Sequence, residues 1–176
     1  MYLYINKRPL NMRKLIWLLM LIFCVNTYSQ NFTREAGIRG GLSSGFTFRQ
    51  YLYESLSYEG LLSFRENGLQ ITLIRQLHVQ TYTEYSENIF LVYGYGGHIG
   101  YNYSNNFKLF FQNEIIYPQP MFSPLIGVDG FAALEYRLDD LPLTFALDYK
   151  PFFELSTRQF FRLSLWDFGF AIKYRF

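Results

Sequence analysis

The sequence predicts an all-β fold: an eight-stranded antiparallel up-and-down transmembrane β-barrel with a polar lumen filled by side chains. Three observations support this prediction. Half of the 176 residues are hydrophobic and 21% are aromatic, more than a soluble domain usually needs. After residue 30, large apolar residues alternate with small or charged ones along most of the chain. No stretch there approaches about 18 consecutive apolar residues, so strands rather than helices would cross a membrane.

The first 29 residues read as a signal peptide, and residues 30–176 as the barrel. Basic residues precede an apolar run from Leu15 to Val25, and Thr27 and Ser29 supply the small residues of a cleavage site. This run is too short to span a bilayer as a helix. Met12 is a second candidate start, because the segment that follows it is a complete signal peptide by itself.

Cleavage after Ser29 would remove four basic residues and no acidic one, so the net charge would fall from +2 to −2. It would also remove Cys24, the only cysteine, so we expect neither a disulfide nor thiolate chemistry afterwards. Cys24 raises the alternative of a lipoprotein signal, but Phe23 stands where such signals carry a small residue. The near-neutral balance gives no reason to expect nucleic acid as a partner.

The first four predicted strands cover residues 38–50, 55–65, 69–79 and 89–103. Each places its large apolar residues on one face, as alternation with a period of two requires. These residues are Leu42, Phe46 and Phe48 in the first strand, Leu56, Tyr58, Leu62 and Phe64 in the second, and Ile89, Leu91, Tyr93, Tyr95, Ile99, Tyr101 and Tyr103 in the fourth. The third strand is weaker, because Arg75 falls on its apolar face.

Three further strands are predicted over residues 126–138, 143–155 and 161–176. Their apolar residues are Ile126, Val128, Leu134, Tyr136 and Leu138 in the first, Leu143, Phe145, Leu147, Tyr149 and Phe153 in the second, and Trp166, Phe168, Phe170, Ile172, Tyr174 and Phe176 in the third. Among these residues, Phe145, Leu147, Phe168 and Phe170 are predicted to face lipid.

An eighth strand, 106–118, is predicted from connectivity rather than from alternation. The turns at 65–68 and 139–142 carry Asn-Gly and Asp-Asp-x-Pro chemistry, and outer-membrane barrels place tight turns at the periplasmic end. With both turns there, strands 89–103 and 126–138 would run in the same direction, so another strand must separate them. The total of eight is even, as closure requires. Outward loops are then expected near residues 51–55, 81–88, 118–123 and 156–159.

Alternation alone also fits a soluble, lipocalin-like barrel, so side-chain size decides which face lies inside. Ordinary side chains just fill an eight-stranded interior, and the apolar face is too bulky for it. The opposite face is rich in small residues, which a narrow lumen needs: Gly41, Gly45, Gly94, Gly96, Gly100, Ala146, Gly169 and Ala171. Aromatic residues cluster at strand ends, as interfacial girdles do. We therefore expect the polar face inside and the aromatic face in lipid.

The polar face carries nearly balanced charges, which we expect to pair because an unpaired buried charge is costly. The predicted network comprises Arg39, Arg49, Glu59, Asp129, Glu135, Arg137, Asp148, Lys150, Asp167, Lys173 and Arg175, with Arg65 and Glu154 beside it. Its expected role is structural, as a plug of ion pairs. A selective pore is the alternative, and it is disfavoured because eight strands leave no continuous channel.

Four stretches of the chain are GIRGGLSSGFTFRQY, YEGLLSFRENGLQIT, GYGGHIGY and LEYRLDDLPLTFALDYKPFFEL. With them, most of residues 36–176 resemble the small eight-stranded outer-membrane barrels of the OmpX and OmpA-barrel kind, and more narrowly an uncharacterised group of Bacteroidetes outer-membrane β-barrel proteins. Residues 104–122 match least. The end of the chain, with Ile172, Tyr174 and Phe176, resembles the signal that the barrel-assembly machinery reads. The resemblance implies the outer membrane of a Gram-negative bacterium and brings no catalytic residues.

No catalytic, cofactor or metal site is predicted. The expected partners are outer-membrane lipid and lipopolysaccharide, with the barrel-assembly machinery during biogenesis. One alternative is a lipid A-modifying enzyme, since acyl transfer uses a His with a Ser. However, His98 is expected in the lumen toward the periplasmic side, and His78, nearer the outer end, shows no Ser beside it. Another alternative is an accessory subunit of a larger outer-membrane complex, whose protein partner the sequence does not name.

Overall fold

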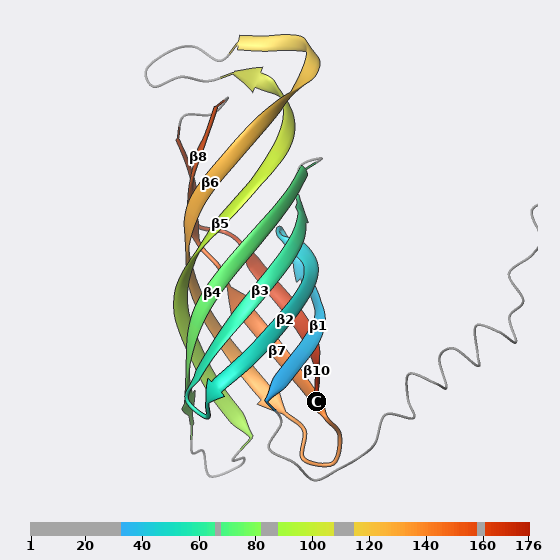
Figure 1. Cartoon of the computed structure of the whole chain (residues 1–176), viewed down its shortest axis with the longest axis vertical. Helices are drawn as coiled ribbons and strands as arrows, with labels where there is room; N and C mark the ends of the chain where they lie inside the picture. The colour runs from blue at the N-terminus through green and yellow to red at the C-terminus, as the bar shows by residue number, and fades with distance from the viewer. Residues whose placement is uncertain (1–32, 66–67, 82–87, 108–114, 158–160) are drawn as a thin grey trace, which may run out of the picture. The chain divides into compact units, whose positions relative to one another are not determined.

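The computed structural model describes residues 33–65, 68–81, 88–107, 115–157 and 161–176, so the predicted signal peptide lies outside the described residues. The described residues form one closed antiparallel sheet (Figure 1). Its strands are β1 (Arg34–Gly41), β2 (Ser44–Tyr53), β3 (Leu56–Arg65), β4 (Gly68–Gln80), β5 (Ile89–Phe107), β6 (Ile115–Arg137), β7 (Leu143–Tyr149), β8 (Phe152–Ser156), β9 (Arg162–Ser164) and β10 (Phe168–Arg175). None of the described residues belongs to a helix long and apolar enough to cross a membrane.

The ten strands make an eight-stranded barrel, because two strands of its wall are interrupted. β7 and β8 pair with successive parts of β6, and β10 and β9 pair in turn with β7 and β8. The two interruptions lie side by side, since the Lys150 amide donates to the Asp167 carbonyl at 2.8 Å. The first strand pairs with the last, and β5 pairs with β6. The predicted all-β, eight-stranded closed barrel is therefore confirmed.

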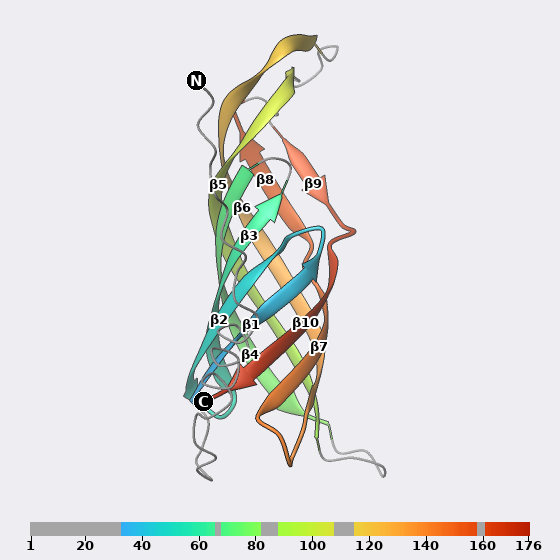
Figure 2. The same ribbon diagram turned by 90° about the vertical axis from the view of Figure 1, so that its right-hand side faces the viewer.

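Because neighbouring strands are antiparallel, their connections alternate between the two ends of the barrel. We call one the termini end, where Arg34 and Phe176 exchange backbone hydrogen bonds of 3.1 and 2.9 Å. The other is the hairpin end, where β5 and β6 extend beyond their neighbours (Figures 1 and 2). Beyond Tyr101, the described part of the chain pairs β5 with β6 alone.

Two predicted elements are wrong, and their errors cancel in the total. Residues 38–50 do not form one strand, because β1 and β2 are separate and joined by the two residues 42–43. Residues 106–118 do not form a strand of their own. Residues 106–107 end β5 and residues 115–118 begin β6, while residues 108–114 lie outside the described part.

The common end predicted for the two tight turns is also wrong. Three strands separate the turn that follows Arg65 from the turn that precedes Leu143, and an odd number of strands puts the two turns at opposite ends. The turn after Arg65 is at the hairpin end. Of the expected outward loops, 51–55 lies at the termini end and 118–123 lies inside β6, whereas residues 82–87 and 158–159 of the other two loops fall outside the described residues.

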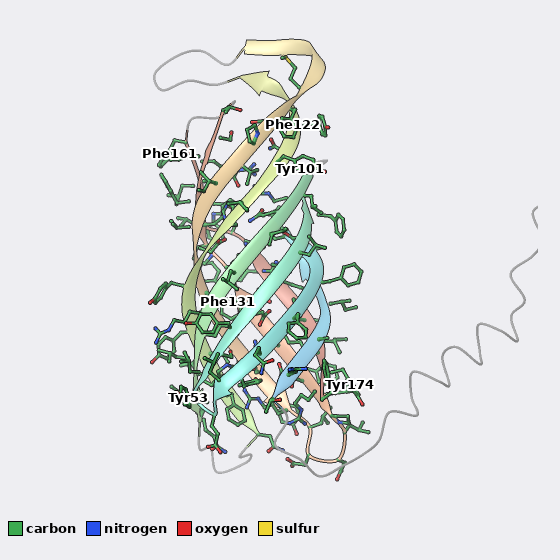
Figure 3. All side chains as sticks on the ribbon, viewed as in Figure 1. Tyr53, Tyr101, Phe122, Phe131, Phe161 and Tyr174 are labelled. Atoms are coloured by element: carbon green, nitrogen blue, oxygen red, sulfur yellow. The ribbon has the colours of Figure 1, made fainter. Side chains whose placement is uncertain are left out.

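Successive residues alternate between a buried face and an exposed face. The exposed face carries large apolar side chains (Figure 3), with Trp166 and Tyr53 exposed by 80% and 71%. The buried face carries small, polar and charged side chains, and Arg49, Lys150, Lys173 and Glu135 are among those almost fully enclosed. One small apolar cluster also lies on the buried face, made of Ile74, Val92, Phe131 and Ala133.

Candidate functional site

Near the termini end, the buried face holds an ion-pair cluster, which we call the Arg49 cluster. It consists of Arg49, Lys173, Arg137, Glu35, Glu59 and Glu135. The Arg49 guanidinium lies 2.9 Å from the Glu35 carboxylate and 2.6 Å from those of both Glu59 and Glu135. Lys173 Nζ lies 2.7 Å from Glu59 and 3.5 Å from Glu135, and Arg137 lies 3.4 Å from Glu135. Three cations thus face three carboxylates.

Strand register explains how the Arg49 cluster forms. Arg49 on β2 stands directly opposite Glu35 on β1 and directly opposite Glu59 on β3. Opposite-charge pairs at directly opposed positions are stabilising. Glu135 then reaches Arg49 across the inside of the barrel from β6. The Tyr51 hydroxyl donates to Glu35 at 3.1 Å and accepts a bond of 3.1 Å from Arg137.

Nearer the hairpin end lies a second cluster, the Arg39 cluster, made of Arg39, Lys150, Asp129, Asp148 and Asp167. The Arg39 guanidinium lies 2.5 Å from Asp148 and 3.2 Å from Asp167. Lys150 Nζ joins Asp129 at 3.0 Å to Asp167 at 3.5 Å. Lys150 and Asp167 meet at the two adjacent interruptions of the wall, so this cluster secures the barrel where ladder hydrogen bonds are missing.

His98 extends the Arg39 cluster toward the hairpin end. Its Nδ1 lies 2.7 Å from the Asp129 carboxylate, and its Nε2 lies 3.5 Å from Glu154. Glu154 also pairs with Arg65, whose guanidinium lies 4.5 Å from the centroid of the Phe152 ring. The prediction placed His98 toward the periplasmic side, but it lies in the middle of β5, beside Gly127 on β6.

Two glycines make room for these side chains. A Cβ on Gly169 would lie 2.7 Å from the Arg39 guanidinium carbon, so a side chain there would displace the arginine. A Cβ on Gly127 would lie 2.4 Å from the His98 ring. Small residues on the buried face therefore leave the space that the large charged side chains occupy.

The structure places ten of the eleven residues of the predicted charge network in the two clusters. The other, Arg175, donates to the backbone carbonyls of Leu138 and Leu141 at the termini end. The predicted network does not include Glu35, because the first predicted strand starts at residue 38. Glu35 and Arg39 are four residues apart and therefore lie on the same face of β1. The residues predicted to face lipid or to signal assembly lie on the exposed face; they are Phe145, Leu147, Phe168, Phe170, Ile172, Tyr174 and Phe176.

His78 does have a serine beside it, which sequence reasoning also missed. The Ser57 hydroxyl lies 2.7 Å from His78 Nε2, and Arg137 Nη2 lies 3.0 Å from Nδ1. An arginine N–H only donates, so Nδ1 accepts and the ring proton sits on Nε2. Nε2 therefore donates to Ser57, whose own proton goes to Gln76 Oε1 at 3.3 Å. A ring in this tautomer cannot accept the Ser57 proton as a general base. His78 also lies at the termini end, not at the end expected from the sequence.

Within the described ranges, no group of three or more His, Cys, Asp or Glu side chains is arranged to hold a metal ion. Comparison of the chain with protein-family models, with curated proteins and with solved structures finds no match. The two clusters join strands to one another across the barrel through ion pairs, and their geometry supports this structural role.

Proposed function

We propose that this chain is an integral outer-membrane β-barrel protein of a Gram-negative bacterium, with a non-catalytic structural, assembly or binding role and no open pore. One observation carries the proposal: the barrel buries its charges and exposes its large apolar side chains. Soluble proteins rarely expose contiguous apolar surface beyond a few hundred Å². A lipid environment removes the cost of such a surface, and barrels are one of two folds that satisfy every backbone group there.

Aromatic spacing along β5 supports a bilayer-sized apolar band. Tyr93 and Tyr103 both lie on the exposed face, ten residues apart. At about 3.3 Å per residue and a strand tilt of about 40°, their separation along the barrel axis is about 25 Å. Outer-membrane barrels have an apolar band of about this height between two aromatic girdles.

A depression on the exposed face also suits lipid. It has a volume of ≈ 220 Å³ and its lining comes from β5, β6, β7 and β10: Ile89, Leu134, Glu135, Tyr136, Phe145, Ala146, Leu147 and Phe170. All of these are apolar or aromatic except Glu135, whose carboxylate belongs to the Arg49 cluster on the buried face. A hydrocarbon chain fits this chemistry better than a polar ligand does.

The two charged clusters support a closed lumen. Arg49 alone joins side chains from β1, β3 and β6 to its own strand β2. Such bridges would have to break before ions passed. We therefore expect the purified protein to give no conductance steps in a planar bilayer, and regular channel openings would contradict the plugged lumen.

The proposed orientation puts the termini end in the periplasm, because outer-membrane barrels carry their longer extensions outside. Outer-membrane lipid and lipopolysaccharide would then contact the exposed face. The barrel-assembly machinery would read the last strand through Ile172, Tyr174 and Phe176, as the resemblance to small outer-membrane barrels implies.

Membrane fractionation combined with gel mobility tests the proposal. We expect the protein in the outer-membrane fraction, and we expect the unheated sample to migrate differently from the boiled sample. A soluble periplasmic product that migrates identically with and without boiling would overturn the membrane assignment. The matched control is the chain with Phe170→Arg, which should reach the periplasm but insert poorly.

An accessory subunit of a larger complex is the second role that we retain, because the wide apolar exposed face can also cover another membrane protein. Affinity purification from native membranes after cross-linking decides between the two. A stoichiometric membrane partner supports the subunit role, and recovery as a free monomer supports a barrel that works alone. The lipid A-modifying alternative gains nothing from His78 and Ser57, since their hydrogen bonds leave no general base.

A further inference from the structure

Arg75 is an exception on the exposed face of the barrel. Within the described strands, it is the one charged side chain whose two neighbours on the same face of its own strand are both large and apolar; they are the exposed Leu73 and the half-buried Leu77. Arg75 also interrupts the alternation of this strand in the sequence, and neither charged cluster includes it. A charge surrounded by apolar groups is expensive and is usually retained for a binding role.

Two tyrosines flank Arg75 on the neighbouring strands. Tyr58 on β3 and Tyr95 on β5 stand directly opposite it. Arg75 Nη1 donates to the Tyr95 hydroxyl at 3.4 Å, and the guanidinium lies 5.9 Å from the centroid of the Tyr95 ring. In the described part of the chain, no carboxylate lies within ion-pair distance of Arg75. Its guanidinium therefore keeps most of its five N–H donors for another group.

Arg75 lies just inside the girdle level nearer the termini end, because it stands opposite Tyr95, two residues along β5 from Tyr93. It lies five residues before Gln80, where β4 ends at that end of the barrel. An arginine buries its aliphatic stem against apolar surface and extends its guanidinium toward the interface. Tyrosines belong to the same level, where one end of the ring is apolar and the other is hydrated.

We propose that Arg75, together with Tyr58 and Tyr95, binds the phosphodiester of a glycerophospholipid in the leaflet nearer the termini end. This inference rests on the proposed membrane location. The planar guanidinium matches two phosphate oxygens at once, and the two hydroxyls add donors beside it. The acyl chains would lie along the apolar exposed face of β4 and β5.

Native mass spectrometry of the full-length protein, purified from membranes in detergent and titrated with phosphatidylglycerol, tests the site. We expect one tightly bound lipid, and we expect Arg75→Gln to weaken its binding about tenfold, as the loss of a charge-assisted contact does. Arg75→Lys should bind between the two, and Tyr95→Phe should lose less than Arg75→Gln. The control Arg34→Gln changes another arginine, which already donates to Gln50 at 2.8 Å, and should bind like the unaltered protein.

Each other outcome of the titration overturns the inference. Equal lipid binding by Arg75→Gln and by the unaltered protein means that Arg75 holds no headgroup. Competition by millimolar inorganic phosphate means that the site takes free anions, and preference for lipid A over phosphatidylglycerol means that it belongs to the other leaflet. Heat-dependent gel mobility of every variant is measured in parallel. A barrel that inserts normally but loses no lipid on Arg75→Gln refutes this inference alone, whereas a chain that never inserts refutes the membrane proposal itself.

Discussion

Glu135 shows how much a single buried residue contributes to this barrel. Its carboxylate lies within 2.6 Å of Arg49, 3.5 Å of Lys173 and 3.4 Å of Arg137. Replacing a whole buried ion pair by apolar residues is often harmless, but removing one partner leaves a charge without compensation. In the Arg49 cluster, loss of one carboxylate would leave three cations facing two acids.

Glu135→Gln should therefore destabilise the folded protein by about 3 kcal/mol, although the side chain keeps its size. Urea unfolding of the protein inserted in lipid vesicles measures this difference. The control is Asp140→Asn, which changes an exposed acid in the turn at the same end and should alter stability little. Equal unfolding midpoints for Glu135→Gln and the unaltered protein would show that the cluster does not stabilise the fold.

Gly169→Ala should also destabilise the barrel, by about 1–3 kcal/mol, because the added methyl group overlaps the Arg39 guanidinium. Gly40→Ala on the neighbouring strand is the matched control. The nearest atom to its new Cβ would be a backbone oxygen at 3.9 Å, so no contact is forced. The same unfolding assay compares the two, and a larger loss for Gly40→Ala would contradict the packing argument.

At the scale of single residues, the sequence predicts well which face of the sheet a side chain lies on. It predicts poorly which other side chain that residue contacts. Alternation is a local property, so it assigned Arg39, Arg49 and Lys173 to one face without knowledge of the register. The pairing of Ser57 with His78 depends on the register between β3 and β4, where Ser57 stands opposite Gln76. No local pattern encodes that offset.

At the scale of strands, the turn between β1 and β2 was missed for a physical reason. Directly opposed residues face the same side, and Arg39 stands opposite Gly45, so the two-residue turn leaves the alternation in phase. Between β3 and β4, Ser63 stands opposite Gln70, and the alternation changes phase there. Only turn chemistry marks the first case: the GGLSSG stretch, in which Gly41 has φ of 154°.

β6 was misjudged because its first half contains Pro118, Pro120 and Pro124. Prolines argue against a central strand, since each lacks a ladder donor. This half of β6 is not central, because beyond Leu125 toward the hairpin end it pairs with β5 and, among the described residues, with no strand on its other side. An open edge tolerates prolines, and they also discourage pairing with another chain.

The last strand gives the sharpest prediction about the exposed face. Phe170 lies near the middle of β10 and is 46% exposed, with its ring centroid 6.2 Å from that of Phe145. Phe170→Arg should reduce the free energy of insertion into vesicles by about 2–4 kcal/mol if that face meets lipid. Phe170→Leu is the control and should insert almost normally. Equal insertion of both variants would place this face away from the hydrocarbon.

At the scale of the whole molecule, closure joins the two ends of the described chain. β1 and β10 pair over seven positions from Glu35 to Gly41, so the barrel cannot close until the last strand exists. The sequence predicted the number of strands correctly but assigned two of them wrongly. It joined β1 and β2 into one strand and placed a separate strand at 106–118, and the requirement for an even total does not reveal two errors that cancel.

A cysteine pair tests this closure. Ile38 on β1 stands directly opposite Ile172 on β10, at a spacing suited to a disulfide of about 5 Å between Cα atoms. Ile38→Cys combined with Ile172→Cys should form an internal disulfide only in the folded protein, as a shift on non-reducing gels shows. The control pair, Ile38→Cys with Phe168→Cys, lies out of register and should stay reduced. Efficient bridging of the control pair would contradict the register.

The interruption between β9 and β10 has a spectroscopic consequence. The chain contains two tryptophans, Trp17 and Trp166, and Trp17 lies within the predicted signal peptide. After cleavage, all indole fluorescence would come from Trp166, which lies within the interruption and is 80% exposed. Its emission would shift to shorter wavelength on transfer from water to lipid, and brominated acyl chains would quench it according to their depth. Trp166 is thus an intrinsic fluorescence probe of how deeply this side of the barrel enters a bilayer.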